Sequence, residues 1–243
     1  MNTSSNGYVM SFAVGVCVVI STMLAVTANN LKPIQDAAAE FDRQKNVMVA
    51  AGLVAPDDKR QRAELEKLYK DRVDEVVVDL SEGKVAAGKS PADVASMKKP
   101  EDRLRYRVVA IGKDTNGKAD TYVLPISGKG LWSTIYGYLA LEHDATHVRG
   151  VTFYKHGETP GLGGECENPV WCAQWKGKSI LDEEHKLVGV GVKKGKVDPA
   201  VPMEKAHKVD GLSGATITSN GITKFVKADL TAFEKYLTGL RQP

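Results

Sequence analysis

Cysteine is scarce in this sequence, with three residues in 243, and their spacing matches none of the common cysteine sites. No C-x-x-C-x-x-C run is present, so an iron–sulfur cluster is not indicated. No G-x-G-x-x-G segment opens a βαβ unit, so nothing suggests a dinucleotide site on this chain. The G-x-S-x-G elbow of serine hydrolases is missing, and the five histidines form no triad pattern. We therefore expect a protein without a complete active site of its own.

Charge of one sign is not in great excess either. The formal net charge of +3 is too mild to indicate nucleic-acid binding. Basic clusters at 59–62, 98–99 and 193–196 have no interleaved aromatic residues, so we interpret them as solvated faces or as contacts with other subunits. His156 and Glu158 lack the H-E-x-x-H spacing of a helical metal site, and no metal is expected.

Charged residues are missing altogether between positions 2 and 31, and the apolar run there is long enough to cross a hydrocarbon core of roughly 30 Å. We predict a transmembrane anchor at 8–31. A cleaved signal peptide is the alternative, but it needs a basic n-region, and residues 1–7 contain no Lys or Arg. The positive-inside count would hold the following segment in the cytoplasm, because that segment carries Lys32, Arg43 and Lys45.

The rest of the chain predicts an α+β fold, in which a mixed, largely antiparallel sheet has flanking helices. We divide it into a helical stalk and N-terminal part of the soluble region at 32–102 and a domain at 103–243. Strands are expected at 73–80, from 103 to 110, and at 119–124, 134–141, 148–154 and 187–192. A surface excursion is expected at 81–101 and a hairpin turn at 115–118. Helices are expected at 33–53, at 62–72 and along the C-terminus, where Ile222, Phe225, Val226, Leu230, Phe233, Leu237 and Leu240 repeat at helical spacing.

A turn of small residues precedes this last helix, at Asp210-Gly211-Leu212-Ser213-Gly214-Ala215-Thr216. The glycines permit tight turning, and Ala215 leaves the surroundings of Thr216 uncrowded. The pattern therefore presents one hydroxyl at a helix start, where free backbone N–H groups favour a phosphate. The simpler interpretation is a plain loop in which Thr218 or Ser219 serves as N-cap.

The stretch fits D-x-x-[ST]-G-A-T, which resembles the flavinylation motif in which the final threonine receives FMN through a phosphoester bond. The same resemblance covers 130–133, 136–138 and 156–164, and it extends upstream to 31–35 and 41–46. Together these segments resemble the C subunit of the sodium-translocating NADH:quinone oxidoreductase. That subunit belongs to the FMN-binding domain family, which is related to the G subunit of the Rnf complex.

The resemblance implies covalent FMN on Thr216, attached by a separate flavin transferase that uses FAD and magnesium, with Asp210 serving that enzyme's recognition or chemistry. It implies an inner-membrane subunit with a periplasmic domain that relays electrons between other subunits of a sodium-pumping NADH:ubiquinone oxidoreductase. We expect Leu131 and Trp132 to form an apolar wall near the flavin, although a Trp there can equally be plain core. The other implied cofactor-binding residues are Ser213, Gly214, Ala215, Glu158, Thr159, Leu162 and Gly163.

Two functional alternatives remain open from the sequence. The chain can be the flavoprotein subunit of an Rnf-type ferredoxin:NAD complex, or a non-redox anchored binding module in which the Ser213–Thr216 segment is only a capped loop. The state of Cys166 and Cys172 is also open, because they can form a disulfide in an oxidising compartment or remain two free thiols.

Overall fold

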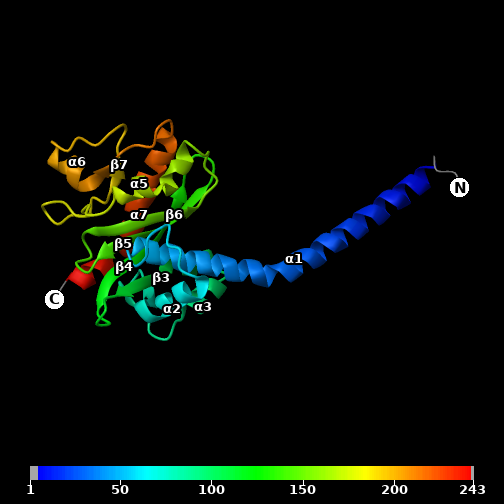
Figure 1. Cartoon of the computed structure of the whole chain (residues 1–243), viewed down its shortest axis with the longest axis horizontal. Helices are drawn as coiled ribbons and strands as arrows, with labels where there is room; N and C mark the ends of the chain where they lie inside the picture. The colour runs from blue at the N-terminus through cyan, green and yellow to red at the C-terminus, as the bar shows by residue number, and fades with distance from the viewer. Residues whose placement is uncertain (1–4, 242–243) are drawn as a thin grey trace. The chain divides into compact units, whose positions relative to one another are not determined.

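The computed structural model describes residues 5–241, whose helices and strands follow the order shown in Figure 1. The chain divides into two compact units, one ending at Arg43 and the other beginning at Gln44. Most of the first unit lies in helix α1 (Asn6–Ala50), and its residues 5–40 are all exposed. By length and composition, α1 is able to cross a membrane. Pro33 lies inside this helix, so the predicted stalk helix is continuous with the apolar segment before it.

The second unit is built on a six-stranded sheet in which every neighbouring pair is antiparallel, in the order β2-β1-β3-β4-β5-β6. Two further short strands pair in parallel outside this sheet. The strands are β1 (Val73–Asp79), β2 (Lys84–Val85), β3 (Tyr106–Lys113), β4 (Ala119–Lys129), β5 (Thr134–Glu142), β6 (Val148–Lys155), β7 (Gly191–Val192) and β8 (Lys208–Val209).

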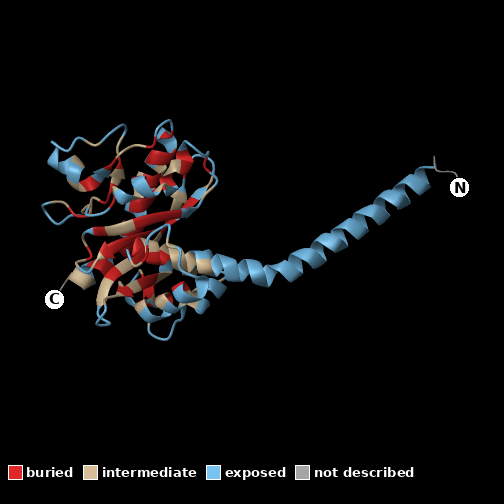
Figure 2. Cartoon of the chain, in the orientation of Figure 1, coloured by how far each residue is buried: buried red, intermediate tan, exposed pale blue. Residues whose placement is uncertain are grey.

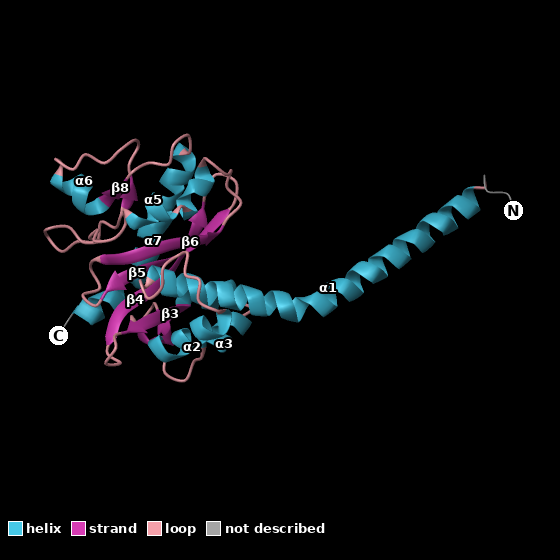
Figure 3. Ribbon diagram, viewed as in Figure 1, coloured by secondary structure: helices cyan, strands magenta, loops and turns pink. Residues whose placement is uncertain are grey.

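Helices flank the sheet and occupy the connections around it, as Figure 3 shows. Beyond α1 they are α2 (Arg62–Arg72), α3 (Pro91–Ser96), α4 (Pro100–Arg105), the 3-10 helix η1 (Gly163–Glu167), α5 (Pro169–Ala173), α6 (Pro202–His207) and α7 (Thr216–Arg241). This arrangement confirms the predicted α+β class and the largely antiparallel sheet. The predicted helix at 62–72, the turn between β3 and β4, and the long C-terminal helix are also confirmed.

The sheet is covered on both faces. Helix α7 approaches β4 so closely that a Cβ on Gly128 would lie 2.2 Å from Cβ of Phe225. The end of α1 lies over β6, where a Cβ on Gly150 would come within 2.6 Å of the carbonyl oxygen of Ala50. These two contacts are on opposite faces of the sheet. Gly150 is in register with Ala140 of β5, which is in register with Val123 of β4. Val123 and Gly128 are an odd number of positions apart along β4, so they face opposite sides of the sheet. Figure 2 shows the buried residues following the strands between these layers.

Two sequence predictions need correction. Residues 103–105 belong to α4 rather than to a strand, because Pro100 starts the helix and Glu101 and Asp102 occupy its first turn, where acidic side chains are favourable. The strand expected at 187–192 is reduced to β7, since Gly189 has a φ of +73° and interrupts the extended backbone. The excursion expected at 81–101 does lie on the surface, where none of its residues is buried, and it contains β2 and α3.

Candidate functional site

The turn before α7 is shaped by hydrogen bonds at both of its ends. The amide of Ala215 donates to the carbonyl of Leu212 across 3.1 Å, and the amide of Leu212 donates to the Ser219 hydroxyl oxygen across 3.3 Å. Between them Gly214 has a φ of +67°, in the left-handed region that a glycine adopts without strain. Thr216 follows as the first residue of α7 and is exposed, as is Ser213, whereas Ala215 is buried.

The first turn of α7 leaves its backbone donors without helical partners. The first bond of the helix runs from the amide of Ser219 to the carbonyl of Ala215, across 2.9 Å. The amides of Thr216, Ile217 and Thr218 therefore have no carbonyl partner within the helix. These N–H groups and the positive end of a 26-residue helix favour an anion beside the Thr216 hydroxyl. Because α7 begins at Thr216, neither Thr218 nor Ser219 is its N-cap.

The carboxylate of Glu158 connects three loops at this site. It accepts hydrogen bonds from the amides of Leu131, Trp132 and Ser133 at 3.1, 2.9 and 3.1 Å, and from the Thr218 hydroxyl at 2.6 Å. Glu158 is only 5% exposed. Burial acts to raise its pKa, but the hydrogen bonds from Thr218 and the three amides outweigh this effect, and the pKa lies below its ordinary value. The group is thus a buried, fully partnered anion.

Glycines make this close packing possible. A Cβ on Gly130 would lie 2.6 Å from Oε1 of Glu158, and one on Gly163 would lie 2.8 Å from the Thr218 hydroxyl oxygen. Neither position has room for a side chain. Two of the segments singled out in the sequence, at 130–133 and 156–164, therefore meet around one carboxylate with the helix turn that follows the third segment at 210–216.

Apolar side chains stand exposed next to this junction. Leu131 is 41% exposed, Trp132 67% and Leu162 43%. The exposure of Trp132 excludes the alternative that it is a core residue. Leu162 lies against the turn before α7, because a Cβ on Gly214 would come within 2.8 Å of its Cδ2 atom. Thr159 is also exposed, and its carbonyl accepts from the amides of Leu162 and Gly164.

Asp210 is engaged within the protein at every polar group. Its carboxylate accepts from the amide of Val197 at 2.7 Å, its amide donates to the side-chain oxygen of Gln174 at 3.0 Å, and its carbonyl accepts from the indole of Trp171 at 2.8 Å. No local pattern in the sequence indicates these partners. Trp171 and Trp175 are both buried core residues.

Cys166 and Cys172 are free thiols in the structure. The Cys172 thiol donates to the carbonyl of Cys166 at 3.2 Å. Burial raises the pKa of each thiol to about 12, so neither is a reactive thiolate near neutral pH.

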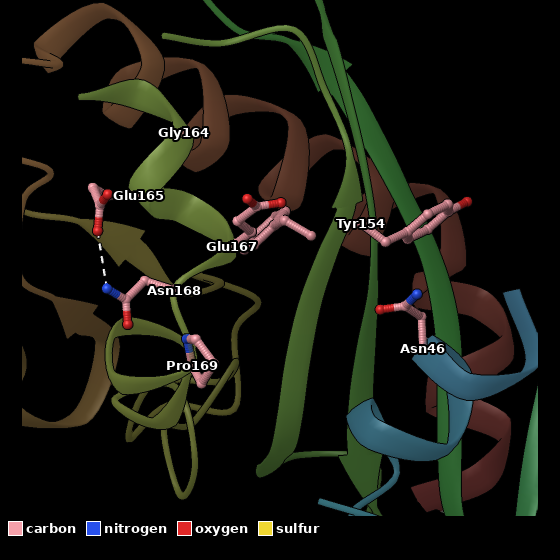
Figure 4. Close-up of a pocket in the computed structure, with 8 residues that line it drawn as sticks. Asn46, Tyr154, Gly164, Glu165, Glu167, Asn168 and Pro169 are labelled. Atoms are coloured by element: carbon pink, nitrogen blue, oxygen red, sulfur yellow. Dashed lines mark hydrogen bonds between the residues drawn. The ribbon is translucent and has the colours of Figure 1, made fainter. Parts of the chain in front are cut away.

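A groove of about 560 Å³ lies beside η1, separate from the residues around Thr216 (Figure 4). In Figure 4 the Glu165 side chain is bonded to Asn168, whose amide lies 2.9 Å from the carboxylate. The Tyr154 and Asn46 side chains stand on the other side of the groove. Its lining is Asn46, Phe153, Tyr154, Gly164, Glu165, Glu167, Asn168 and Pro169. Thr216 is not among these residues, so its hydroxyl does not line this groove.

Comparison with known proteins agrees with this geometry. Residues 130–231, which include the whole junction, match the family model of the FMN-binding domain. The C subunit of the Na(+)-translocating NADH-quinone reductase of Pseudomonas aeruginosa is 39% identical, and the match covers 99% of this chain and 98% of that protein. The same subunit of Pasteurella multocida is 35% identical over 93% of this chain and 90% of the relative. The crystal structure of Shewanella oneidensis NqrC superposes with a TM-score of 0.70 at 30% identity, covering 85% of this chain and all of that one.

The fold and the site thus define a protein in which an FMN-binding domain follows one long apolar helix along the chain. The chain belongs to the family formed by the C subunits of the Na(+)-translocating NADH-quinone reductases.

Proposed function

We propose that Thr216 carries FMN covalently, through a phosphoester bond between its side-chain oxygen and the flavin phosphate. The observation that carries this proposal is the exposed Thr216 hydroxyl at the start of α7, beside backbone N–H groups that have no helical partner. Leu131, Trp132 and Leu162 offer exposed apolar surface for the flavin ring next to the same turn. We assign the remaining contacts to Ser213, Gly214, Ala215, Thr159 and Gly163, and we assign to Glu158 the task of holding their loops together.

Attachment requires a second protein. Within residues 5–241, no side chain hydrogen-bonds to the Thr216 hydroxyl, so no described side chain is placed to accept its proton. A flavin transferase that binds FAD and magnesium would supply that base. The Thr216 oxygen–phosphorus bond would form as the pyrophosphate bond of FAD breaks, AMP would leave, and the hydroxyl proton would pass to the transferase.

The chain then acts as the flavoprotein subunit of a sodium-translocating NADH–quinone reductase. Bound FMN supplies the capacity to accept and release electrons, and this chain fixes the position of the flavin and its exposure to solvent. The anchor at 8–31 would hold the domain to the bacterial inner membrane, with 32–102 and 103–243 on the periplasmic side. The other subunits of the complex would deliver and remove the electrons.

The attachment site is tested by in-gel ultraviolet fluorescence of the denatured full-length protein after coexpression with a flavin transferase. We expect a fluorescent band whose flavin maps by peptide mass spectrometry to Thr216. Thr216→Val should give a dark band, while Thr231→Val, the same change at an exposed position of the same helix, should remain fluorescent. A dark wild-type band, with the transferase active on a known substrate, would favour the non-redox binding module instead.

Electron relay and orientation are tested separately. In the assembled complex, Thr216→Val should abolish NADH-dependent quinone reduction, while Thr231→Val leaves it intact. Equal turnover of the two complexes would show that electrons bypass this subunit.

The orientation in the membrane is tested by fusing alkaline phosphatase to the C-terminus. The fusion should be active in whole cells if the domain is periplasmic, and inactive if the positive-inside count is correct.

A further inference from the structure

The turn at 193–197, which we call the basic turn, is fastened to the segment before Thr216 by two backbone hydrogen bonds and one bond to a side chain. The amide of Lys193 donates to the carbonyl of Val209 at 2.9 Å, and the amide of Gly211 donates to the carbonyl of Gly195 at 2.7 Å. The third bond runs from the amide of Val197 to the Asp210 carboxylate. The contact is tight, because a Cβ on Gly211 would lie 2.4 Å from the Lys193 carbonyl oxygen.

The basic turn presents positive charge that the protein does not neutralise. The ammonium group of Lys193 is paired with Glu204. Lys194 and Lys196 are exposed, and neither ammonium group has a hydrogen bond or ion pair within the described part of the chain. Lys208, on the adjoining strand β8, is exposed and has no hydrogen bond or close ion pair among the same residues, and its charge acts at longer range on the Glu204 carboxylate. A partner that covers this surface therefore gains most if its own face is acidic.

This surface lies within the reach of any protein that encloses Thr216. The hydrogen bond from the Ala215 amide to the Leu212 carbonyl closes a turn whose end Cα atoms lie within about 7 Å of each other. With one Cα–Cα step of about 3.8 Å on each side, the Cα atoms of Gly211 and Thr216 are at most about 15 Å apart. A standard protein interface covers about 800 Å² on each partner, which corresponds to a disc of about 16 Å radius. An enzyme centred on Thr216 would therefore extend to Gly211, where the basic turn is fastened.

We propose that the basic turn is a docking surface for an acidic face of the flavin transferase, and that Asp210 is the residue that holds this surface beside Thr216. The proposal rests on the proposed function of Thr216. It gives Asp210 a positioning role beside the recognition or chemistry that the resemblance implies, because one of its carboxylate oxygens accepts from the amide of Val197. The sequence suggested only that the 193–196 cluster was a solvated face or a contact with another subunit.

Charge reversal tests the surface. The full-length protein, purified without flavin, is mixed with purified transferase, FAD and magnesium, and the initial rate of covalent FMN incorporation is measured at several salt concentrations. We expect Lys194→Glu with Lys196→Glu to lower this rate about tenfold at low salt and to remove most of its salt dependence, because rim charges act on association. The final extent of incorporation should match that of the wild type.

The control is Lys67→Glu with Lys70→Glu, two exposed lysines on α2, which packs against β1 rather than near α7. This control should react at the wild-type rate. A wild-type rate and salt dependence in the 194/196 variant would overturn the proposal. Absence of covalent flavin in the wild type itself would overturn the function proposed for Thr216, and the docking surface with it.

Two variants of Asp210 distinguish a role in positioning the basic turn from a direct role in recognition or chemistry. Asp210→Asn keeps an oxygen that can accept from the Val197 amide, so it should retain a rate close to wild type. Asp210→Ala removes the acceptor and should slow FMN incorporation as strongly as the double lysine variant. The fluorescence of its buried tryptophans should match that of the wild type, which checks that the variant is folded. If Asp210→Asn is as slow as Asp210→Ala, the charge itself is required and the holding role is wrong.

Discussion

The Thr218 hydroxyl donates a 2.6 Å hydrogen bond to the Glu158 carboxylate, although the two residues are 60 positions apart in the chain. Both side chains are buried, with Thr218 1% and Glu158 5% exposed. This bond joins the first turn of α7 to the loop after β6, and the same carboxylate binds the loop between β4 and β5. The exposed Thr216 therefore lies two residues from a side chain that is hydrogen-bonded to two other parts of the chain.

Removing the Glu158 carboxylate should weaken the fold. Glu158→Ala leaves three part-buried amides and the buried Thr218 hydroxyl without an acceptor, so we expect a loss of about 3 kcal/mol in the free energy of unfolding. Glu158→Gln keeps one acceptor oxygen and should lose clearly less. Urea unfolding of the full-length protein in detergent, followed by tryptophan fluorescence, measures both. Equal stability of Glu158→Ala and the wild type would show that the junction contributes nothing.

The same residue predicts a pH dependence. Because the folded-state pKa of Glu158 is lowered from its ordinary value of 4.5, its ionisation stabilises the folded state above about pH 4.5. That stabilisation is lost as the pH falls through the folded pKa. The stability difference between the wild type and Glu158→Gln should therefore be full at pH 6–7 and shrink below pH 4.5. A difference that stays constant down to pH 3 would contradict the lowered pKa.

Two glycines of α7 should respond to alanine in opposite directions. A Cβ on Gly221 would lie 2.3 Å from the carbonyl oxygen of Lys129, so Gly221→Ala should push the helix off β4 and cost about 1–3 kcal/mol. Nothing lies within 4 Å of the equivalent position on Gly239. Gly239→Ala should therefore stabilise the protein by up to about 1 kcal/mol through helix propensity. Thermal unfolding of the two variants tests the sign of each effect.

The two thiols of the second unit should be protected in the native protein. With burial raising the pKa of both Cys166 and Cys172 to about 12, iodoacetamide at pH 8 should label neither in a Cys17→Ser background. Unfolding without reductant should then expose two alkylation sites. A protein that takes up no label on unfolding until a reductant is added contains a disulfide, which would contradict the free thiols of the structure.

Much of the fold follows from local sequence patterns. The apolar spacing from Ile222 to Leu240 predicts α7, and alternation predicts most of β3 to β6. The alternating apolar pattern predicted the wrong secondary structure where a helix start or a glycine with positive φ interrupted the strand. Pro100 and its acidic neighbours made 103–105 helical, and Gly189 interrupted the strand expected at 187–192. Both failures occur at element ends, where short-range preferences compete with the periodic pattern.

At the site, the sequence by itself pointed to the segments that meet there, because the small-residue turn ending in Thr216 and the glycine-rich loop at 156–164 are recognisable patterns and 130–133 carries the family resemblance. Tertiary structure alone decided what their side chains do. Glu158, expected as a flavin contact, is placed as the buried acceptor for Thr218, and Asp210 is bound to Val197. The physical reason is that hydrogen bonds between residues distant in sequence depend on chain packing, which no local periodicity encodes.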